Sequence, residues 1–151
     1  VEVQALVTSS SSIGMPRRMS AGFDHNRTSL LVAIMEKRLG LNLQGEDIFI
    51  NIAGGLKISE PAVDMGVAAA IAGSFRNRSV DPHTVMIGEV GLTGEVRSVM
   101  QLEARLTEAE RLGFKKCVVP HSIKEDRLLN KNSSLRLVPV KTLSEAFDAV
   151  F

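Results

Sequence analysis

The chain has 151 residues, a length that suits one globular domain with a single hydrophobic core. A hydrophobic fraction of 44% with 12 glycines and 5 prolines excludes the disordered and fibrous classes, and a net charge of +1 gives no global field to attract nucleic acid. The aromatic fraction is 4%, without Trp or Tyr, which argues against a surface that binds bases by stacking.

The first half of the chain predicts two strands, a helix and a third strand. Val1–Thr8 and Arg17–Ala21 show the alternation typical of strands, and we expect them to form a hairpin. Asp24 is a suitable cap for a helix that Gly40 ends. Asp47–Ile52 is the third predicted strand.

A buried helix and two short strands are predicted next. Pro61 suits the first position of a helix, and the residues that follow are apolar almost all round, which indicates burial on every side. Thr84–Ile87 and Gly94–Arg97 are predicted strands around a turn at Gly91–Gly94.

The last third of the chain predicts two further helices and two strands. Ser98 and Gln101 have the spacing of a capping box, for a helix that ends at Gly113. The inner face of this helix is predicted to hold Leu102, Leu106, Ala109 and Leu112. Lys116–Val119 and Leu135–Val140 are predicted strands, separated by a polar stretch, and Thr142 with Glu145 caps the final helix.

This order of elements predicts an α/β fold. Strands alternate with helices, and no repeat or linker divides the chain, so we expect one two-layer domain over residues 1–151 with a mixed sheet packed against helices. The opening at Val1, inside a predicted strand, indicates a fragment of a longer protein.

The cellular setting is predicted from what the chain lacks. Cys117 is the single cysteine, no secretory signal precedes the first strand, and no apolar run approaches the roughly 20 residues of a membrane helix. We therefore expect a reducing, cytoplasmic setting and no membrane partner.

Common cofactor motifs are also missing. The chain has no Gly-x-x-x-x-Gly-Lys-Ser/Thr loop, and the glycines of Gly88–Gly94 lie between two strands, whereas a phosphate-binding loop joins a strand to a helix. His25, His83 and His121 are widely separated, and Cys117 lies in an apolar strand, where it is better interpreted as core. We expect no cofactor and no metal in this domain.

Three segments resemble the proteolytic domain of Lon: Asn51–Ala62, Gly88–Arg97 and Gln101–Ala109. In that family a serine after a proline is the nucleophile, and a lysine on a later helix takes its proton. Pro61 matches the proline, but the serine position falls on Ala62 and the lysine position on Glu103. A methyl group cannot attack a carbonyl and a carboxylate has the wrong charge, so the resemblance implies a fold without peptidase activity.

A displaced dyad is the alternative enzymatic hypothesis. Lys57 and Ser59 are two residues apart in an extended segment, so their side chains could project to the same side. A serine before Glu60-Pro61 is more simply a helix cap.

Within the Lon-like group, further motifs resemble the carboxy-terminal domain of the RadA family of bacterial DNA repair ATPases. The matching segments are Val1–Val7, Pro16–Arg18, Gly22–Arg27, Phe49–Lys57, Gly88–Arg97 and Gly113–Lys116.

The resemblance to these domains implies the Lon-like fold, which is also the fold of ribosomal protein S5 domain 2. It also implies a scaffold for a hexameric ring and a surface that contacts single-stranded and branched double-stranded DNA. The family's zinc motif and DNA-dependent ATPase, with their zinc, Mg²⁺ and ATP, would lie upstream. A Lon-like domain of a magnesium-chelatase-like ATPase is the remaining alternative.

The preferred DNA contacts are Lys57 and Arg97, because Lon brings the two segments that carry them together at its active cleft. Cations beside a helix amino terminus suit a phosphate. The competing interpretation is that they pair with Glu60, Glu89 or Glu95 and only tie loops together. Secondary candidates are Arg17 and Arg18, and weaker ones are Arg27, Arg76, Arg78, Lys115 and Lys116.

Overall fold

The computed structural model describes residues 1–11, 14–123 and 133–151. The chain forms two compact units, one from Val1–Glu60 and Val67–Ser79, and the other from Pro61–Gly66 and Val80–Phe151. Two compact units of this size can belong to one domain. The single domain expected over residues 1–151 therefore stays a prediction.

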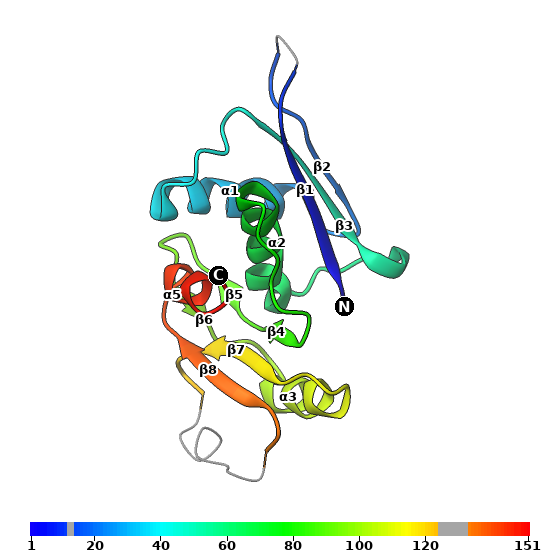
Figure 1. The fold of residues 1–151 in the computed structure, drawn as a ribbon, viewed down its shortest axis with the longest axis vertical. Helices are drawn as coiled ribbons and strands as arrows, with labels where there is room; N and C mark the ends of the chain where they lie inside the picture. Colours follow the sequence, from blue (N-terminus) through cyan, green and yellow to red (C-terminus); the bar gives the residue numbers. More distant parts are fainter. Residues whose placement is uncertain (12–13, 124–132) are drawn as a thin grey trace. The chain divides into compact units, whose positions relative to one another are not determined.

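The first unit contains a three-stranded sheet in the order β1-β3-β2 (Figure 1). β1 (Val3–Ser9) is antiparallel to β3 (Glu46–Ile52), and β2 (Arg18–Ala21) is parallel to β3. The predicted hairpin of the first two strands is therefore wrong, because β3 lies between them. Alternation identifies which face of a strand is buried, but it does not identify the neighbouring strand.

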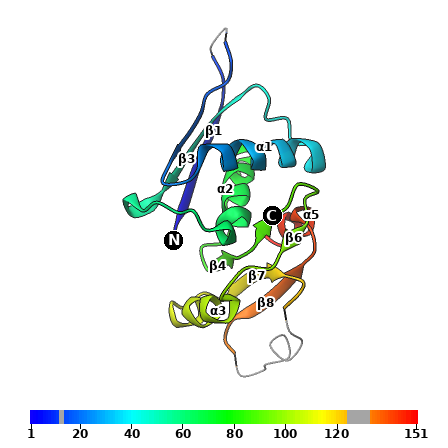
Figure 2. The ribbon, with the colours of Figure 1, turned by 180° about the vertical axis from the view of Figure 1, so that it is seen from behind.

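Helix α1 (His25–Leu39) confirms both predicted boundaries. The Asp24 side chain accepts the N–H of Arg27 at 2.7 Å, and Gly40 ends the helix in the left-handed conformation with a φ of 65°. Figures 1 and 2 show α1 and the later part of α2 (Asp64–Arg76) on the same side of the sheet. The buried residues of α1 are Thr28, Leu31, Val32, Ile34 and Met35.

The buried helix begins later than its proline. Pro61–Val63 is a turn of 3-10 helix, and the α-helix starts at Asp64. The prediction of burial is confirmed, because Met65, Val67 and Ile71 are fully buried.

The second unit contains a parallel sheet in the order β4-β7-β8, formed by Thr84–Met86, Lys116–Pro120 and Arg136–Val140. A separate antiparallel pair joins β5 (Glu89–Val90) to β6 (Val96–Arg97) across the turn. The strand predicted at Gly94–Arg97 thus pairs with β5 and not with the strand predicted at Thr84–Ile87. The latter is β4, which pairs with β7 in the parallel sheet.

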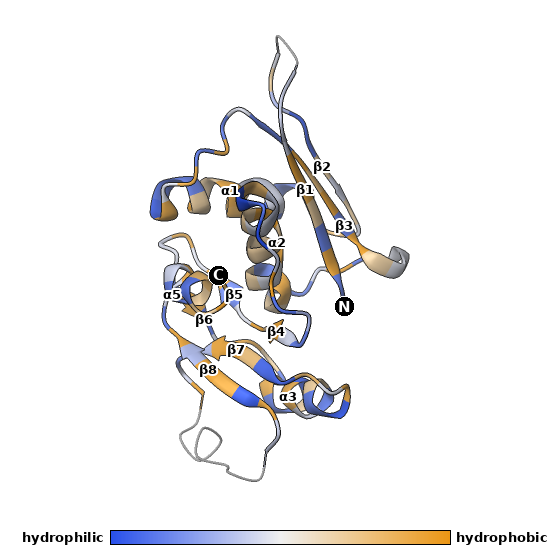
Figure 3. Ribbon diagram, in the orientation of Figure 1, coloured by the Kyte–Doolittle hydropathy of each residue, from blue (hydrophilic) through white to orange (hydrophobic). Residues whose placement is uncertain are grey.

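Helix α3 (Leu102–Arg111) covers β7 with its apolar side. Leu106 and Ala109 pack in one core cluster with Cys117 and Val119, and Figure 3 shows the hydrophobic residues along β7 and β8. Leu112 is 63% exposed, which corrects its predicted place on the inner face, because the helix ends at Arg111.

The capping box predicted for α3 is also wrong. Gln101 is itself the residue before the helix, in the left-handed conformation and without a side-chain cap, while the Ser98 hydroxyl bonds that of Ser122. The last helix, α5 (Leu143–Asp148), follows its prediction, because Thr142 accepts the N–H of Glu145 at 3.2 Å.

The α/β class is confirmed, and the described residues form three sheets in place of the one expected mixed sheet. Among the helices of the described ranges, none combines the length and the apolar character that crossing a bilayer requires.

Candidate functional site

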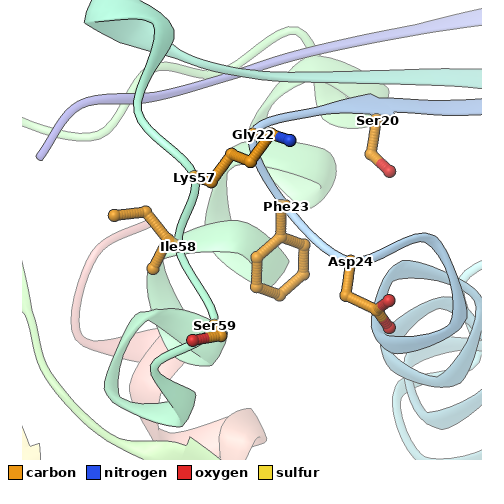
Figure 4. Close-up of a pocket in the computed structure, with 7 residues that line it drawn as sticks. All are labelled: Ser20, Gly22, Phe23, Asp24, Lys57, Ile58 and Ser59. Atoms are coloured by element: carbon orange, nitrogen blue, oxygen red, sulfur yellow. The ribbon is translucent and has the colours of Figure 1, made fainter.

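A pocket of about 360 Å³ opens in the first unit where β2 leads into α1 (Figure 4). Its lining residues come from two segments that are distant in sequence, Ser20, Gly22, Phe23 and Asp24 from one and Lys57, Ile58 and Ser59 from the other. The pocket therefore includes Lys57, the first of the two preferred contacts.

Backbone pairing fixes the two segments together. The N–H of Ile58 donates to the carbonyl oxygen of Gly22 at 2.8 Å, and Phe23 forms a parallel bridge with Ile58. The Phe23 ring points into the pocket between them (Figure 4). Lys57 is therefore carried on a segment that is bound to the end of β2.

The Lys57 side chain is exposed. Within residues 1–11, 14–123 and 133–151, its ammonium takes part in no hydrogen bond or ion pair. The competing interpretation, a pair between Lys57 and Glu60, thus has no contact to support it. An exposed ammonium on a fixed backbone is available to an anion from solution.

Figure 4 shows the Lys57 ammonium and the Ser59 hydroxyl pointing in opposite directions. No hydrogen bond joins them in the described part of the chain, and Ser59 does not cap the turn at Pro61. The geometry of a general base with its nucleophile is therefore not formed by this pair.

Asp24 limits what the pocket can bind. Its carboxylate already accepts an N–H at the start of α1 and carries a negative charge of its own. An anion at the helix terminus itself would be repelled, so the Lys57 side of the pocket is the side that suits a phosphate.

Arg97 lies in the second unit, on β6, opposite Glu89 in the strand register. It is exposed, and no described residue lies within ion-pair distance of its guanidinium. Lys57 belongs to the first unit, so the expectation that the two cations flank one site stays a prediction.

The carboxylate of Glu95, next to Arg97 on the hairpin, is held by the turn. It accepts the hydroxyl of Thr93 and also its N–H, at 3.1 Å. These bonds, the hydroxyl first, lower the pKa of Glu95, and the charge of Arg97 contributes the smallest lowering. Glu95 therefore stabilises the turn and does not neutralise Arg97 by direct contact.

The two positions that the resemblance assigns to a Lon dyad, Ala62 and Glu103, both lie in the second unit. Ala62 is 3% exposed and belongs to the core cluster, and its carbonyl oxygen accepts the N–H of Gly88 at 3.0 Å. Asp64 accepts the N–H of Val90 at 3.1 Å. Glu103 is exposed in the first turn of α3. The alanine position is thus a packed, hydrogen-bonded part of the core.

Arg17 has a structural role that its sequence context did not reveal. Its guanidinium donates to the Asp47 carboxylate at 2.8 and 3.0 Å, and its backbone N–H donates to the same group at 2.7 Å. The guanidinium also lies 5.6 Å from the centre of the Phe49 ring. Arg17 is therefore less available to DNA than an unpaired cation.

The other secondary candidates differ in their availability. Arg18 is half-buried, and its Nη1 atom is buried without a hydrogen-bond partner among the described residues. Lys116 donates to the carbonyl oxygen of Ala149 at 2.9 Å, whereas Lys115 is exposed. Arg27, Arg76 and Arg78 each interact with another residue.

Sequence reasoning missed the part that Ser20, Gly22 and Phe23 play in this pocket. Gly22–Arg27 is one of the motifs singled out above, but its pairing with Ile58 joins segments more than thirty residues apart. No local pattern reports such a contact.

The pocket around Lys57 is not accompanied by a candidate metal centre in the described residues. The described residues contain no group of three or more His, Cys, Asp or Glu that could hold a metal ion. Cys117 is buried, as predicted for a core residue, and burial raises the pKa of its thiol to about 12.

The chain matches the family model described as subunit ChlI of Mg-chelatase over residues 4–123. It is also similar to proteins named DNA repair protein RadA. It is 48% identical over 151 residues to that of Halalkalibacterium halodurans, covering 98% of this chain and 32% of the relative. It is 53% identical over 120 residues to that of Bacillus subtilis, covering 80% of this chain and 26% of the relative. It is 43% identical over 150 residues to that of Streptococcus pneumoniae, covering 99% of this chain and 35% of the relative.

The chain thus spans about a third of the length of the curated relatives it matches. The two comparisons agree, because the family model and the RadA relatives match the same region of the chain. The chain therefore belongs to the family described as subunit ChlI of Mg-chelatase, and it is similar to one region of the proteins named DNA repair protein RadA.

Proposed function

We propose that this chain is the non-proteolytic Lon-like domain of a RadA-type DNA repair ATPase, and that Lys57 contacts a backbone phosphate of DNA. The domain also serves as a scaffold for a hexameric ring that processes branched recombination intermediates in the cytoplasm. ATP, Mg²⁺ and zinc belong to parts of the protein outside these 151 residues. The names of the relatives support the DNA repair role.

The exposed ammonium of Lys57 is the observation that carries the proposed DNA contact. It has no ion-pair or hydrogen-bond partner among the described residues, and the N–H of the next residue, Ile58, is bonded to Gly22, directly after β2. A cation on a backbone that is held in place loses less conformational freedom on binding a phosphate than one on a free loop. Phosphate contacts of this kind position a protein on DNA without reading sequence.

Arg97 is the second proposed contact, on the short hairpin of the second unit. Arg18 and Lys115 rank next. Arg17 ranks lower, because binding a phosphate would compete with its bonds to Asp47. The weaker candidates already interact within the chain and would lose those interactions on binding a phosphate; they are Arg27, Arg76, Arg78 and Lys116.

The absence of peptidase activity is proposed from chemistry at the dyad positions. Ala62 supplies no hydroxyl and Glu103 no amine, so neither nucleophile nor base stands where Lon-type chemistry needs them. The displaced pair Lys57 and Ser59 points in opposite directions, which supports the same conclusion.

The test measures DNA affinity of the full-length protein as a function of salt, for the parent and for Lys57→Ala and Arg97→Ala. Fluorescence anisotropy with single-stranded and branched DNA supplies the dissociation constants. Each lost phosphate contact should reduce the slope of log K against log salt by about 1 and weaken all sequences alike. Between 50 and 200 mM salt, the affinity of each variant should therefore fall roughly threefold less than that of the parent.

Lys37→Ala is the matched control, since it removes the same charge from an exposed position near the end of α1. It should leave affinity and slope unchanged, and all variants should keep the assembly mass of the parent in light scattering. If Lys57→Ala and Arg97→Ala both bind like the parent, the proposed DNA contacts are wrong.

A chemical rescue isolates the charge of Lys57. Lys57→Cys has an exposed thiol, whereas the natural Cys117 is buried and has a raised pKa, and the parent treated with the same reagents controls for cysteines outside these 151 residues. An aminoethyl methanethiosulfonate restores a positive charge and should restore the affinity, while a neutral methanethiosulfonate should not.

A further inference from the structure

Gly22 makes an unusually close approach to the segment that carries Lys57. Its φ is +81°, in the left-handed region that side-chain-bearing residues rarely adopt. A Cβ atom at this position would overlap the carbonyl oxygen of Leu56 and would lie 2.8 Å from the Cβ of Ile52.

Neither of these neighbours can move away alone. The carbonyl of Leu56 is backbone, directly before Lys57, and Ile52 is the last residue of β3 and is buried. A side chain at position 22 would push the Leu56–Ile58 segment outwards, which would also break the 2.8 Å hydrogen bond from Ile58 to Gly22.

We infer that Gly22 is a positioning residue for Lys57: the missing side chain lets the Leu56–Ile58 segment dock on the end of β2, and this docking sets where the ammonium meets a DNA phosphate. The inference rests on the proposed function of Lys57. It adds a residue that bears no charge and needs no contact with DNA of its own.

Other glycines of the first unit do not share this arrangement. A Cβ at Gly40 or Gly45 would meet no atom within 4 Å. Gly40 also has a positive φ, of +65°, so Gly40→Ala carries the same kind of backbone strain without the overlap. It is the matched control for Gly22→Ala.

The experiment is a double-mutant cycle in the full-length protein, with Gly22→Ala, Lys57→Ala and the double variant. DNA affinity is measured by anisotropy near 0.1 M salt. Lys57→Ala should weaken binding on the order of tenfold, and Gly22→Ala by roughly threefold or more, with a reduced salt slope in both. The double variant should bind no more weakly than Lys57→Ala alone, because the displaced cation is already gone.

A merely structural role for Gly22 gives a different result. Gly22→Ala would then weaken binding by the same factor with or without Lys57, and that additivity would overturn the inference. Gly40→Ala should keep the affinity of the parent even though its thermal midpoint falls.

Failure of the inference differs from failure of the proposed function. If Lys57→Ala has no effect, the proposed contact itself is wrong; if Lys57→Ala weakens binding and a folded Gly22→Ala does not, only the positioning role is wrong. Should Gly22→Ala not fold by circular dichroism, Ile58→Pro decides. It removes the N–H that Gly22 accepts, and unchanged affinity in that variant overturns the inference.

Discussion

Asp47 shows how one residue can turn a nearby cation into a structural group. Its carboxylate is 2% exposed, while the Arg17 side chain that it binds is 59% exposed. The backbone N–H of Arg17, and then its guanidinium, lower the pKa of Asp47 below the ordinary value of 3.8. The buried carboxylate is thus satisfied from one residue by main chain and side chain together.

This arrangement predicts a pH dependence. A carboxylate with a lowered pKa stabilises the folded chain at every pH above 3.8, and that contribution is lost as the pH falls from 3.8 through the lower, folded-state pKa. Asp47→Asn should therefore unfold more easily than the parent at pH 7. The difference in the free energy of unfolding, measured with urea, should shrink below pH 3.8; a constant difference from pH 7 to pH 2 would contradict the prediction.

At the scale of single elements, a predicted helix start was correct where the side chain of the predicted cap residue accepts an N–H of the helix. Asp24 and Thr142 each accept an N–H three residues later. Ser98 and Gln101 have the same polar character and spacing, yet Ser98 bonds Ser122 and the helix begins after Gln101. A tertiary hydrogen bond thus replaced the local one.

The two kinds of helix start predict different effects of alanine. Thr142→Ala should lower the free energy of unfolding by about 1 kcal/mol, because an N–H at the start of α5 loses its acceptor. Gln101→Ala removes no cap bond and should change stability by less than about 0.5 kcal/mol. Urea titrations of both variants test this, and equal losses would show that Gln101 caps α3 after all.

The pairing of strands in the first unit depends on tertiary contacts and not on the strands taken singly. β1 and β2 are joined by a short connection, which favours a hairpin, but each pairs with β3 instead. The parallel pairing of β2 with β3 places the end of β2 beside the segment that follows β3. This brings Gly22 and Lys57 together.

For the molecule as a whole, the position that the resemblance assigns to the Lon nucleophile belongs to the core. Ala62 packs with Leu106 and Ala109 of α3, and its carbonyl is bonded to Gly88. Introducing a serine at position 62 and a lysine at position 103 would therefore not create an open catalytic site. A hydroxyl at position 62 would be buried among apolar side chains.

This predicts the behaviour of the double variant Ala62→Ser, Glu103→Lys. It should hydrolyse no fluorogenic peptide, and the added hydroxyl should destabilise the fold by about 1–3 kcal/mol if it finds no partner. Peptide turnover by this variant, with loss on reverting Ser to Ala, would show that the site remains open.

The sequence by itself determined the α/β class, both ends of α1, the start of α5, the buried character of α2 and Cys117, and the resemblance to RadA-type domains. These features depend on local patterns, because periodicity, caps and motifs are written in neighbouring residues. Only the tertiary structure decided that β3 separates β1 from β2, that Asp47 engages Arg17 and that Gly22 holds the Lys57 segment. Each of these joins residues about thirty or more positions apart, and the close approach that selects them has no local signature in the chain.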